Sequence, residues 1–195
     1  MEHKHHGKSS AKFLDSDEIL GELDFKGNEI FMDAGCGDGY ISIKAIEDYI
    51  TGGTVYAVDI HEESLKGLRE YKKVNNSDNL VSLVADISEG ISDIENGSID
   101  VILMVNVFHG FKTTGKEDAV IDELARLIKD DGKIAIVDFN KIDIPHGPSV
   151  DIKCSPERLE ELFNKHNLKK AYLNEKLGAD YPEGKSHYMI IFKKE

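Results

Sequence analysis

The sequence predicts an α/β fold in which a mostly parallel sheet of seven strands is covered by helices on both faces. From Glu29 onward, short apolar runs rich in β-branched residues alternate with amphipathic helical patterns. Each of the first five runs ends at or near a polar residue. The last two runs are close neighbours in the sequence and predict an antiparallel pair at the end of the sheet.

The strand predictions follow the apolar runs in chain order. They cover Glu29 to Asp33, Thr54 to Asp59, Leu80 to Ala85, Ile99 to Val105, Lys133 to Asp138, Lys169 to Leu173 and Tyr188 to Phe192. Ligands of open α/β sheets bind outside the carboxyl ends of the strands. We therefore expect one rim of the sheet to gather Asp33, Asp59, Asp86, Asn106 and Asp138.

Helices are predicted where isoleucines and leucines recur at helical spacing. The clearest sets are Ile43, Ile46 and Ile50, and Ile121, Leu124 and Ile128. The segments Gly52-Gly53 and Asp130-Asp131-Gly132 are expected to end these two helices. Ser155 and Pro156 predict a further helix start, and Gly178, Pro182 and Gly184 mark a polar connection before the last strand.

Size and charge narrow the class of protein. The 195 residues with 40% hydrophobic content suffice for one sizeable core. A formal net charge of -13 disfavours nucleic acid and anionic membranes as partners, so a small molecule or a protein is expected. No apolar run reaches the roughly 18 to 20 residues of a membrane span, which predicts a soluble, cytoplasmic protein. Cys36 and Cys154 lack disulfide or zinc spacing and are interpreted as free thiols.

The most informative motif is the glycine-rich turn from Phe31 to Tyr40. Glycines at alternate positions let a ligand approach the backbone, while Asp33 and Asp38 bracket the turn without any lysine or arginine. This charge pattern favours a cationic nucleotide such as S-adenosylmethionine over a pyrophosphate. A dinucleotide fingerprint needs a third glycine at position 40, which is tyrosine. A turn that only joins a strand to a helix, without a ligand, stays open.

Four motifs together carry a family resemblance. They are Asp33 to Gly39, Val55 to Asp59, Ala85-Asp86 and Ser98 to Met104. In this order and spacing the chain, from Glu29 to Phe192, resembles class I S-adenosylmethionine-dependent methyltransferases. Within that superfamily it is similar to the small ubiquinone/menaquinone-biosynthesis-type enzymes. The resemblance implies a Rossmann-like sheet, S-adenosylmethionine as cofactor and methyl transfer to an acceptor.

The resemblance also implies which residues bind the cofactor. Asp59 is expected to accept hydrogen bonds from the ribose hydroxyls, and Asp86 from the adenine amine. Asn106 is expected beside the methionine part. The full set is Asp33, Gly35, Cys36, Gly37, Asp59, Ile60, Asp86, Ile87 and Asn106. Considered alone, Asp59 could instead cap the segment that starts at His61.

His109 is the candidate catalytic base, because it follows the fourth strand on the same rim and histidine exchanges protons near neutral pH. The alternative is that His109 bonds a loop carbonyl or shapes the pocket. The loop from Pro145 to Pro148 is expected to line the acceptor pocket with Phe108, His109 and Phe111, or to be an ordinary connection. Cys36 is rejected as a nucleophile, since neighbouring carboxylates raise the pKa of a thiol.

The predicted domain boundaries are 1 to 28 for an N-terminal segment with a lid helix, and 29 to 195 for the methyltransferase domain. Asp15 or Ser16 would cap the helix, and Phe13 and Leu14 would cover the cofactor or pack outside the sheet. The cluster His3, His5 and His6 could coordinate a metal, but a solvated terminus or a cloning remnant explains it as well. No metal site is predicted.

Three functions are open at this stage. The first is methyl transfer to a small molecule, with the pocket closed by the N-terminal helix and the rim loops. The second is methylation of a protein docked on the open rim. The third is a protein that binds S-adenosylmethionine without transfer, linked to a metal through the N-terminal histidines. The fold by itself does not fix the acceptor.

Overall fold

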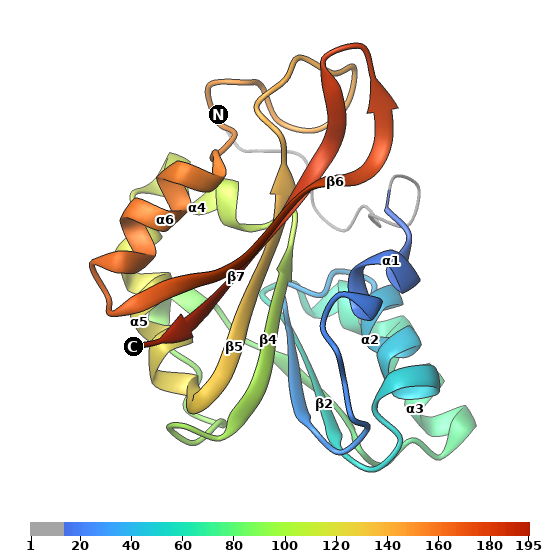
Figure 1. Ribbon diagram of the computed structural model, residues 1–195. Helices are drawn as coiled ribbons and strands as arrows, with labels where there is room; N and C mark the ends of the chain where they lie inside the picture. Colours follow the sequence, from blue (N-terminus) through green and yellow to red (C-terminus); the bar gives the residue numbers. More distant parts are fainter. Residues whose placement is uncertain (1–13) are drawn as a thin grey trace.

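The computed structural model describes residues 14–195, which form one seven-stranded sheet in the order β3-β2-β1-β4-β5-β7-β6 (Figure 1). The strands are β1 (Ile30–Ala34), β2 (Thr54–Asp59), β3 (Leu80–Val84), β4 (Ile99–Val105), β5 (Ile128–Phe139), β6 (Leu168–Tyr181) and β7 (Gly184–Lys194). Strands β1 to β5 pair in parallel, whereas β7 is antiparallel to both β5 and β6. The predicted sheet, mostly parallel with an antiparallel C-terminal strand, is confirmed.

The strand order reverses between β1 and β4, and this reversal places the expected ligand crevice. Strand β1 pairs with β2 on one side and with β4 on the other. The connections after β1 and after β4 therefore leave in opposite directions and open a crevice at the carboxyl edge. The first three strands form one half of this rim, and β4, β5 and β7 form the other.

Helices cover both faces of the sheet (Figure 1). One face carries α1 (Ser16–Gly21), α2 (Tyr40–Lys44) with its π-helical extension Ala45–Tyr49, and α3 (Lys66–Asn75). The other carries α4 (Phe108–Thr114), α5 (Glu117–Leu127) and α6 (Pro156–Asn164). Two predicted caps are confirmed: the Asp15 carboxylate accepts from the backbone N–H of Asp17, and Ser155 Oγ from that of Arg158. Each satisfies an otherwise unpaired donor at a helix start.

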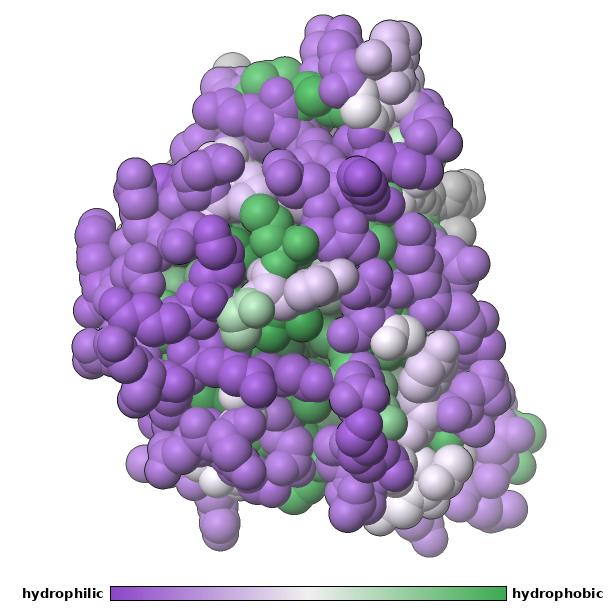
Figure 2. Space-filling model, viewed as in Figure 1, coloured by the Kyte–Doolittle hydropathy of each residue, from purple (hydrophilic) through white to green (hydrophobic). Residues whose placement is uncertain are grey.

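The face of the molecule seen in Figure 2 is mainly hydrophilic. Figure 2 shows one face with hydrophobic side chains gathered near its centre, where β6 crosses the front of the sheet. Tyr172 of this strand is 40% exposed. Among residues 14–195, no helix combines the length and apolarity needed to cross a membrane.

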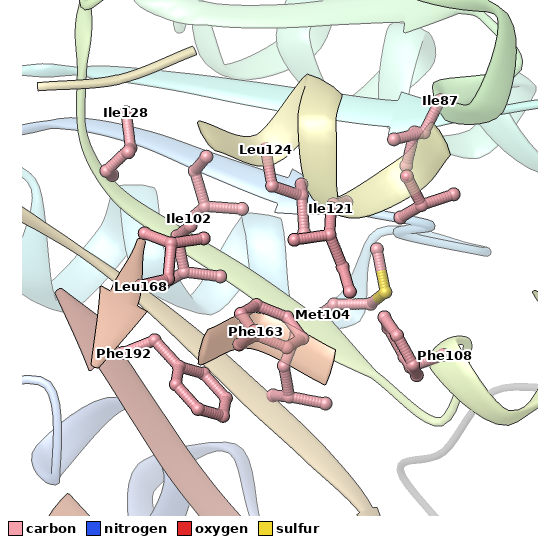
Figure 3. Close-up of a cluster of buried hydrophobic side chains, with 14 of the residues drawn as sticks. Ile87, Ile102, Met104, Phe108, Ile121, Leu124, Ile128, Phe163, Leu168 and Phe192 are labelled. Carbon is pink, nitrogen blue, oxygen red and sulfur yellow. The ribbon is translucent and has the colours of Figure 1, made fainter. Parts of the chain in front are cut away.

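Two hydrophobic clusters fill the space between the sheet and its helices. The cluster under α5 and α6 includes Ile102, Met104, Ile121 and Leu124, all fully buried (Figure 3). Phe163 of α6 stacks on Phe192 of β7 with ring centroids 4.0 Å apart. The second cluster packs α1, α2 and α3 on the opposite face. Because both faces are buried, the sheet holds its rim residues in fixed positions.

The structure corrects two boundaries. The expected helix stop at Asp130-Asp131-Gly132 is wrong: α5 ends at Leu127, and these residues belong to β5. The expected polar connection before the last strand is wrong as well, since β6 and β7 extend to Tyr181 and Gly184 as one long hairpin. Backbone pairing with β7 keeps this polar part of β6 extended, and hydrophobic periodicity carries no signal for such pairing.

Candidate functional site

The glycine-rich turn joins β1 to α2 at the centre of the carboxyl rim. The backbone N–H groups of Gly35 and Cys36 donate to the carbonyl of Val58 at 2.7 and 3.0 Å. Gly35 has a φ of +80°, and a Cβ there would lie 2.5 Å from Val107 Cγ2. Gly37 has a φ of +55°, and a Cβ at this position would have no heavy atom within 4 Å. The turn is therefore packed on one side and open at Gly37, where a ligand can approach the backbone.

Asp33 lies beneath the turn. It is 2% exposed, and Ser42 Oγ donates to its Oδ2 at 2.6 Å. Burial raises the pKa of Asp33 to about 7, with the nearby charge of Asp59 adding to the effect. Asp38 of the same turn is exposed, and α2 begins at Tyr40. The cationic ligand that the sequence predicts would therefore have one buried and one exposed carboxylate of this turn nearby.

Cys36 is buried and belongs to the packing of the turn. Burial raises the pKa of its thiol, and the charges of Asp33 and Asp59 raise it further. The thiol is consequently protonated at neutral pH and is a poor nucleophile. Both cysteines of the chain are free thiols, as the sequence predicts.

Asp59 connects the end of β2 to the glycine turn. Its Oδ2 accepts from the N–H of Gly37 at 2.9 Å, and its Oδ1 accepts from the N–H of His61 at 2.8 Å. A carboxylate has about four acceptor positions, so roughly two stay available for ribose hydroxyls. The two interpretations of Asp59, ligand contact and local cap, are thus compatible.

Ile60 follows directly and is 54% exposed. A large, solvent-exposed apolar side chain is a suitable surface for an adenine face, and the neighbouring Asp59 carboxylate still has free acceptor positions. The structure therefore places a stacking surface and a hydrogen-bond acceptor next to each other at the end of β2.

Asp86 and Ile87 open the loop after β3. Asp86 Oδ1 accepts from both the N–H and the Oγ of Ser88, and Lys116 Nζ lies 3.5 Å from Oδ2. Burial acts to raise the pKa of Asp86, but the Ser88 hydrogen bonds and the charge of Lys116 outweigh it, so the pKa is lowered. Ile87 is 5% exposed, with its side chain in the core. This leaves its backbone amide as the group that can face a ligand.

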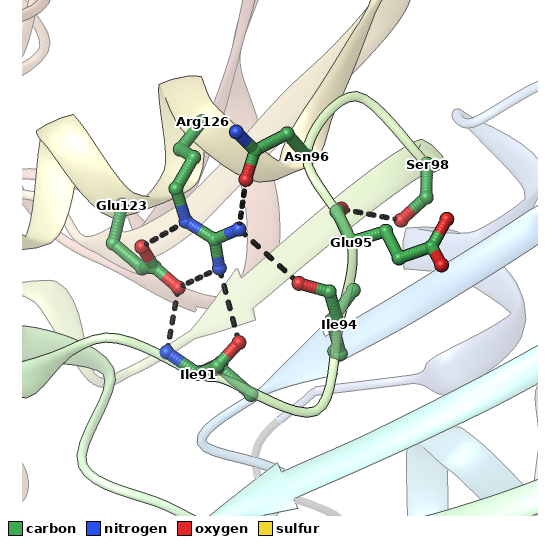
Figure 4. A network of polar contacts seen from close by, with 7 residues as sticks. All are labelled: Ile91, Ile94, Glu95, Asn96, Ser98, Glu123 and Arg126. Carbon is green, nitrogen blue, oxygen red and sulfur yellow. Dashed lines mark hydrogen bonds and ion pairs between the residues drawn. The ribbon is translucent and has the colours of Figure 1, made fainter.

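A polar network, which we did not expect from the sequence, fixes the continuation of this loop (Figure 4). Glu123 Oε1 accepts from the N–H of Ile91 at 2.7 Å, and Arg126 donates to the carbonyls of Ile91 and Ile94. Arg126 and Glu123 also pair with each other on α5. The only feature of the sequence that could have predicted the Glu123–Arg126 pair is the spacing of three residues, which places both side chains on one helix face.

Asn106 directly follows β4 and has a φ of +58°, which asparagine tolerates better than most residues. Its backbone N–H donates to the carbonyl of Val137 at 2.9 Å. The next residue, Val107, packs on Gly35 of the turn. The chain therefore turns at the crevice between β1 and β4, where the sequence predicts the methionine part of the cofactor.

His109 and Asp138 form a hydrogen-bonded pair on the second half of the rim. His109 Nδ1 lies 2.8 Å from Asp138 Oδ1, and the N–H of His109 donates to Oδ2 at 3.0 Å. Asp138 is fully buried, whereas the His109 side chain is 17% exposed. An ionised carboxylate only accepts, so Nδ1 carries the proton and Nε2 presents a lone pair. The partner of His109 is therefore a carboxylate and not a loop carbonyl.

Rings and nitrogen-bearing side chains surround Phe139 next to this pair. The ring centroids of His187, His109 and His146 lie 4.3, 5.8 and 6.4 Å from that of Phe139. Lys153 Nζ lies 5.4 Å from the same centroid. We call this set, namely Phe139, His109, His146, His187 and Lys153, the Phe139 cluster. The loop with Pro145 and His146 contacts Phe139 through His146, whereas His187 and Lys153 are not predicted from the sequence.

Two further expectations have different outcomes. Phe108 does not line a pocket, because its ring is fully buried against Phe163 and Phe111. Leu14 is 4% exposed and belongs to the core cluster of α1 to α3.

His3, His5, His6 and Phe13 lie outside the described residues. In the part of the chain from 14 to 195, no group of three or more His, Cys, Asp or Glu could hold a metal ion.

The residues of the first half of the rim fit S-adenosylmethionine. Gly37 offers open backbone, Asp59 offers unused acceptor positions, and Ile60 offers an exposed apolar face. No lysine or arginine stands in the turn, so the carboxylates favour a ligand with positive charge.

Comparisons with known proteins agree with this fit. A family model described as a methyltransferase domain matches residues 25–194. No curated protein matches the chain. Among solved structures, an S-adenosylmethionine-dependent methyltransferase from Aquifex aeolicus superposes with a TM-score of 0.77 at 21% identity, covering 92% of this chain and 89% of the other.

Two more solved structures have the same fold. A protein from Pyrococcus horikoshii superposes with a TM-score of 0.70 at 20% identity, covering 92% and 88% of the two chains. An S-adenosylmethionine-dependent methyltransferase from Methanosarcina mazei gives 0.70 at 16% identity, covering 90% and 96%. With a family model matching residues 25–194, the chain belongs to the methyltransferase domain family, and its rim residues fit S-adenosylmethionine as the methyl donor.

Proposed function

We propose that this enzyme transfers a methyl group to a small-molecule acceptor bound over the ends of β4 and β5. The observation that carries the proposal is the His109–Asp138 pair, which stands on the same rim as the cofactor residues. A base fixed by a buried carboxylate suits an acceptor that enters between the rim loops. When bound, S-adenosylmethionine supplies a methyl group on a sulfonium, and the leaving group departs uncharged.

In this proposal the first half of the rim binds the cofactor. Asp59 accepts the ribose hydroxyls, Asp86 accepts the adenine amine, and the Ile87 amide faces a ring nitrogen. Ile60 covers the adenine face, and Asn106 lies beside the methionine part. Asp33, Gly35, Cys36 and Gly37 form the turn beneath. Their common task is to hold the donor still, because in-line transfer depends on alignment at about 3 to 3.5 Å.

His109 would remove the proton from the acceptor as the new bond forms. Asp138 holds the proton on Nδ1, so Nε2 is the atom that accepts a proton from a hydroxyl or amine. The buried carboxylate then stabilises the imidazolium. The same division of roles operates in serine hydrolases.

The helix α1 is proposed as part of the cover over the site. Glu22 accepts hydrogen bonds from Tyr172 Oη at 2.5 Å and from Asn174 Nδ2 at 3.0 Å, both on β6. Asp17 and Lys44 form an ion pair at 3.0 Å that ties α1 to α2. Residues 1 to 28 would thus act as a lid segment on a domain of residues 29 to 195, and the enzyme would work in the cytoplasm.

We also propose a closer relation to one group within the superfamily. The motifs resemble those of small ubiquinone/menaquinone-biosynthesis-type methyltransferases, whose acceptors are small molecules.

A labelling experiment tests the proposal. Purified enzyme receives methyl-labelled S-adenosylmethionine and a cell extract that has been separated into a small-molecule fraction and a protein fraction. We expect label in the small-molecule fraction and stoichiometric S-adenosylhomocysteine. Acid-precipitable label alone would indicate a protein methyltransferase. Calorimetric binding of the donor without any transfer would indicate a binding protein.

A further inference from the structure

His187 is a buried imidazole with one unused nitrogen. It is fully buried, and its Nδ1 lies 2.7 Å from Ser186 Oγ. That oxygen accepts from the N–H of Ala179 at 2.9 Å, and Nδ1 is its only other partner among the described residues, so the hydroxyl proton is assigned to the hydrogen bond with Nδ1. The neutral ring then carries its proton on Nε2. Within residues 14–195, Nε2 has no hydrogen-bond partner.

The neutral state of His187 follows from its surroundings. Burial lowers the pKa of its imidazole to about 4; the Asp138 carboxylate opposes this shift, and the Lys153 ammonium adds to it. A buried N–H without an acceptor costs about 1 to 3 kcal/mol. The orphaned donor therefore points to an acceptor atom that the folded chain itself does not provide.

Lys153 is a second hydrogen-bond donor with N–H groups available for a ligand. It is 1% exposed, and its Nζ donates to the carbonyl of Ile142 at 2.7 Å. An ammonium has three N–H groups, so two of them stay available. No described carboxylate forms an ion pair with Lys153. Asp138 is occupied by its hydrogen bonds from His109 and from the Phe139 N–H.

The two donors lie next to the proposed base. Both contact Phe139, which His109 approaches as well. In a chain of net charge -13, a buried lysine without an ion pair marks a place suited to an anion. A carboxylate offers two oxygens for two donors. A phosphate carries more charge and more oxygens than this pair can satisfy.

We propose that His187 and Lys153 form a subsite for the carboxylate of an acidic acceptor, next to the base that deprotonates its hydroxyl or amine. The proposal rests on the proposed function, since it names the acceptor class of the same site. It implies an acceptor that carries both a carboxylate and a nucleophilic hydroxyl or amine.

The test measures binding, not turnover. Enzyme loaded with S-adenosylhomocysteine is titrated calorimetrically with 3,4-dihydroxybenzoate. The methyl ester of this acid, which lacks the negative charge, is titrated in the same way for comparison. We expect the carboxylate to bind at least about tenfold more tightly than the ester, as one charged hydrogen bond provides. His187→Phe and Lys153→Met should each remove this preference. Lys141→Met, which removes an exposed charge from the same loop, is the control.

Three results would overturn the subsite. They are equal affinity for acid and ester, unchanged preference in both variants, and no binding of either probe to loaded enzyme. Unaltered affinity for S-adenosylhomocysteine in the variants shows that they are folded. Failure of the proposed function looks different, because label would then enter protein and not small molecules.

Discussion

The two halves of the carboxyl rim carry opposite chemistry. At the ends of β1, β2 and β3 the functional side chains are carboxylates, with Asp33 and Asp59 closest to the glycine turn. At the ends of β4 and β5 and near the start of β7 they are imidazoles and an ammonium around Phe139, with one buried carboxylate, Asp138, bound to His109. The difference teaches that one sheet edge can carry an acidic half and a mainly basic half, which we propose to hold the cationic donor and the acceptor. Each half can therefore be altered separately.

The largest expected effect lies in the basic half. His109→Gln removes the proton acceptor, so turnover of a hydroxyl or amine acceptor should fall by about 10² to 10⁴. The cofactor affinity should stay within about twofold of the wild type. Initial rates of S-adenosylhomocysteine formation and calorimetry provide the two measurements.

His166→Gln is the matched control, because His166 pairs with Asp118 and Asp122 away from the rim. If His109→Gln turns over acceptor as fast as this control, His109 is not the base.

The next effect lies in the acidic half and concerns folding stability. The folded pKa of Asp33, about 7, is above its ordinary value of 3.8. The folded state therefore retains a proton that the unfolded chain has lost, and the stabilisation is complete below pH 3.8 and lost as the pH rises through 7. Asp33→Asn removes this dependence. The free energy of unfolding of the Asp33→Asn variant, relative to that of the wild type, should therefore increase from pH 4 to pH 8 by up to about 4 kcal/mol.

Urea unfolding at a series of pH values measures this change. Asp38→Asn, in the exposed carboxylate of the same turn, should follow the wild-type curve. Parallel curves for Asp33→Asn and the wild type would show that Asp33 is ionised throughout.

The smallest expected effect concerns the affinity for the methyl donor, which we expect the acidic half alone to bind. Asp59→Asn weakens the hydrogen bonds to Gly37 and to the ribose, and the affinity for S-adenosylmethionine should drop by about 10- to 100-fold. The affinity for 3,4-dihydroxybenzoate in loaded enzyme should not change. Asp93→Asn, at an exposed position away from the strand ends, is the calorimetric control. An unchanged donor affinity would remove Asp59 from the site.

Much of the acidic half could be predicted from the sequence. Glycine spacing, strand ends and the acidic residue after β2 are local signals, and the turn from Gly35 to Gly39 and Asp59 lie together as expected. Strands β2 and β4 have the predicted bounds. The basic half was only partly predictable, because His187 belongs to the antiparallel strand β7 and reaches Phe139 through strand pairing.

By itself, the sequence determined the family, the order of strands and helices along the chain, and the cofactor turn. These depend on local backbone preferences and on hydrophobic periodicity, which act over a few residues. The tertiary structure alone decided the partner of His109, the burial of Lys153 and the unused nitrogen of His187. Those features depend on which distant segments the sheet brings together and on water being excluded there, and no short stretch of sequence carries that information.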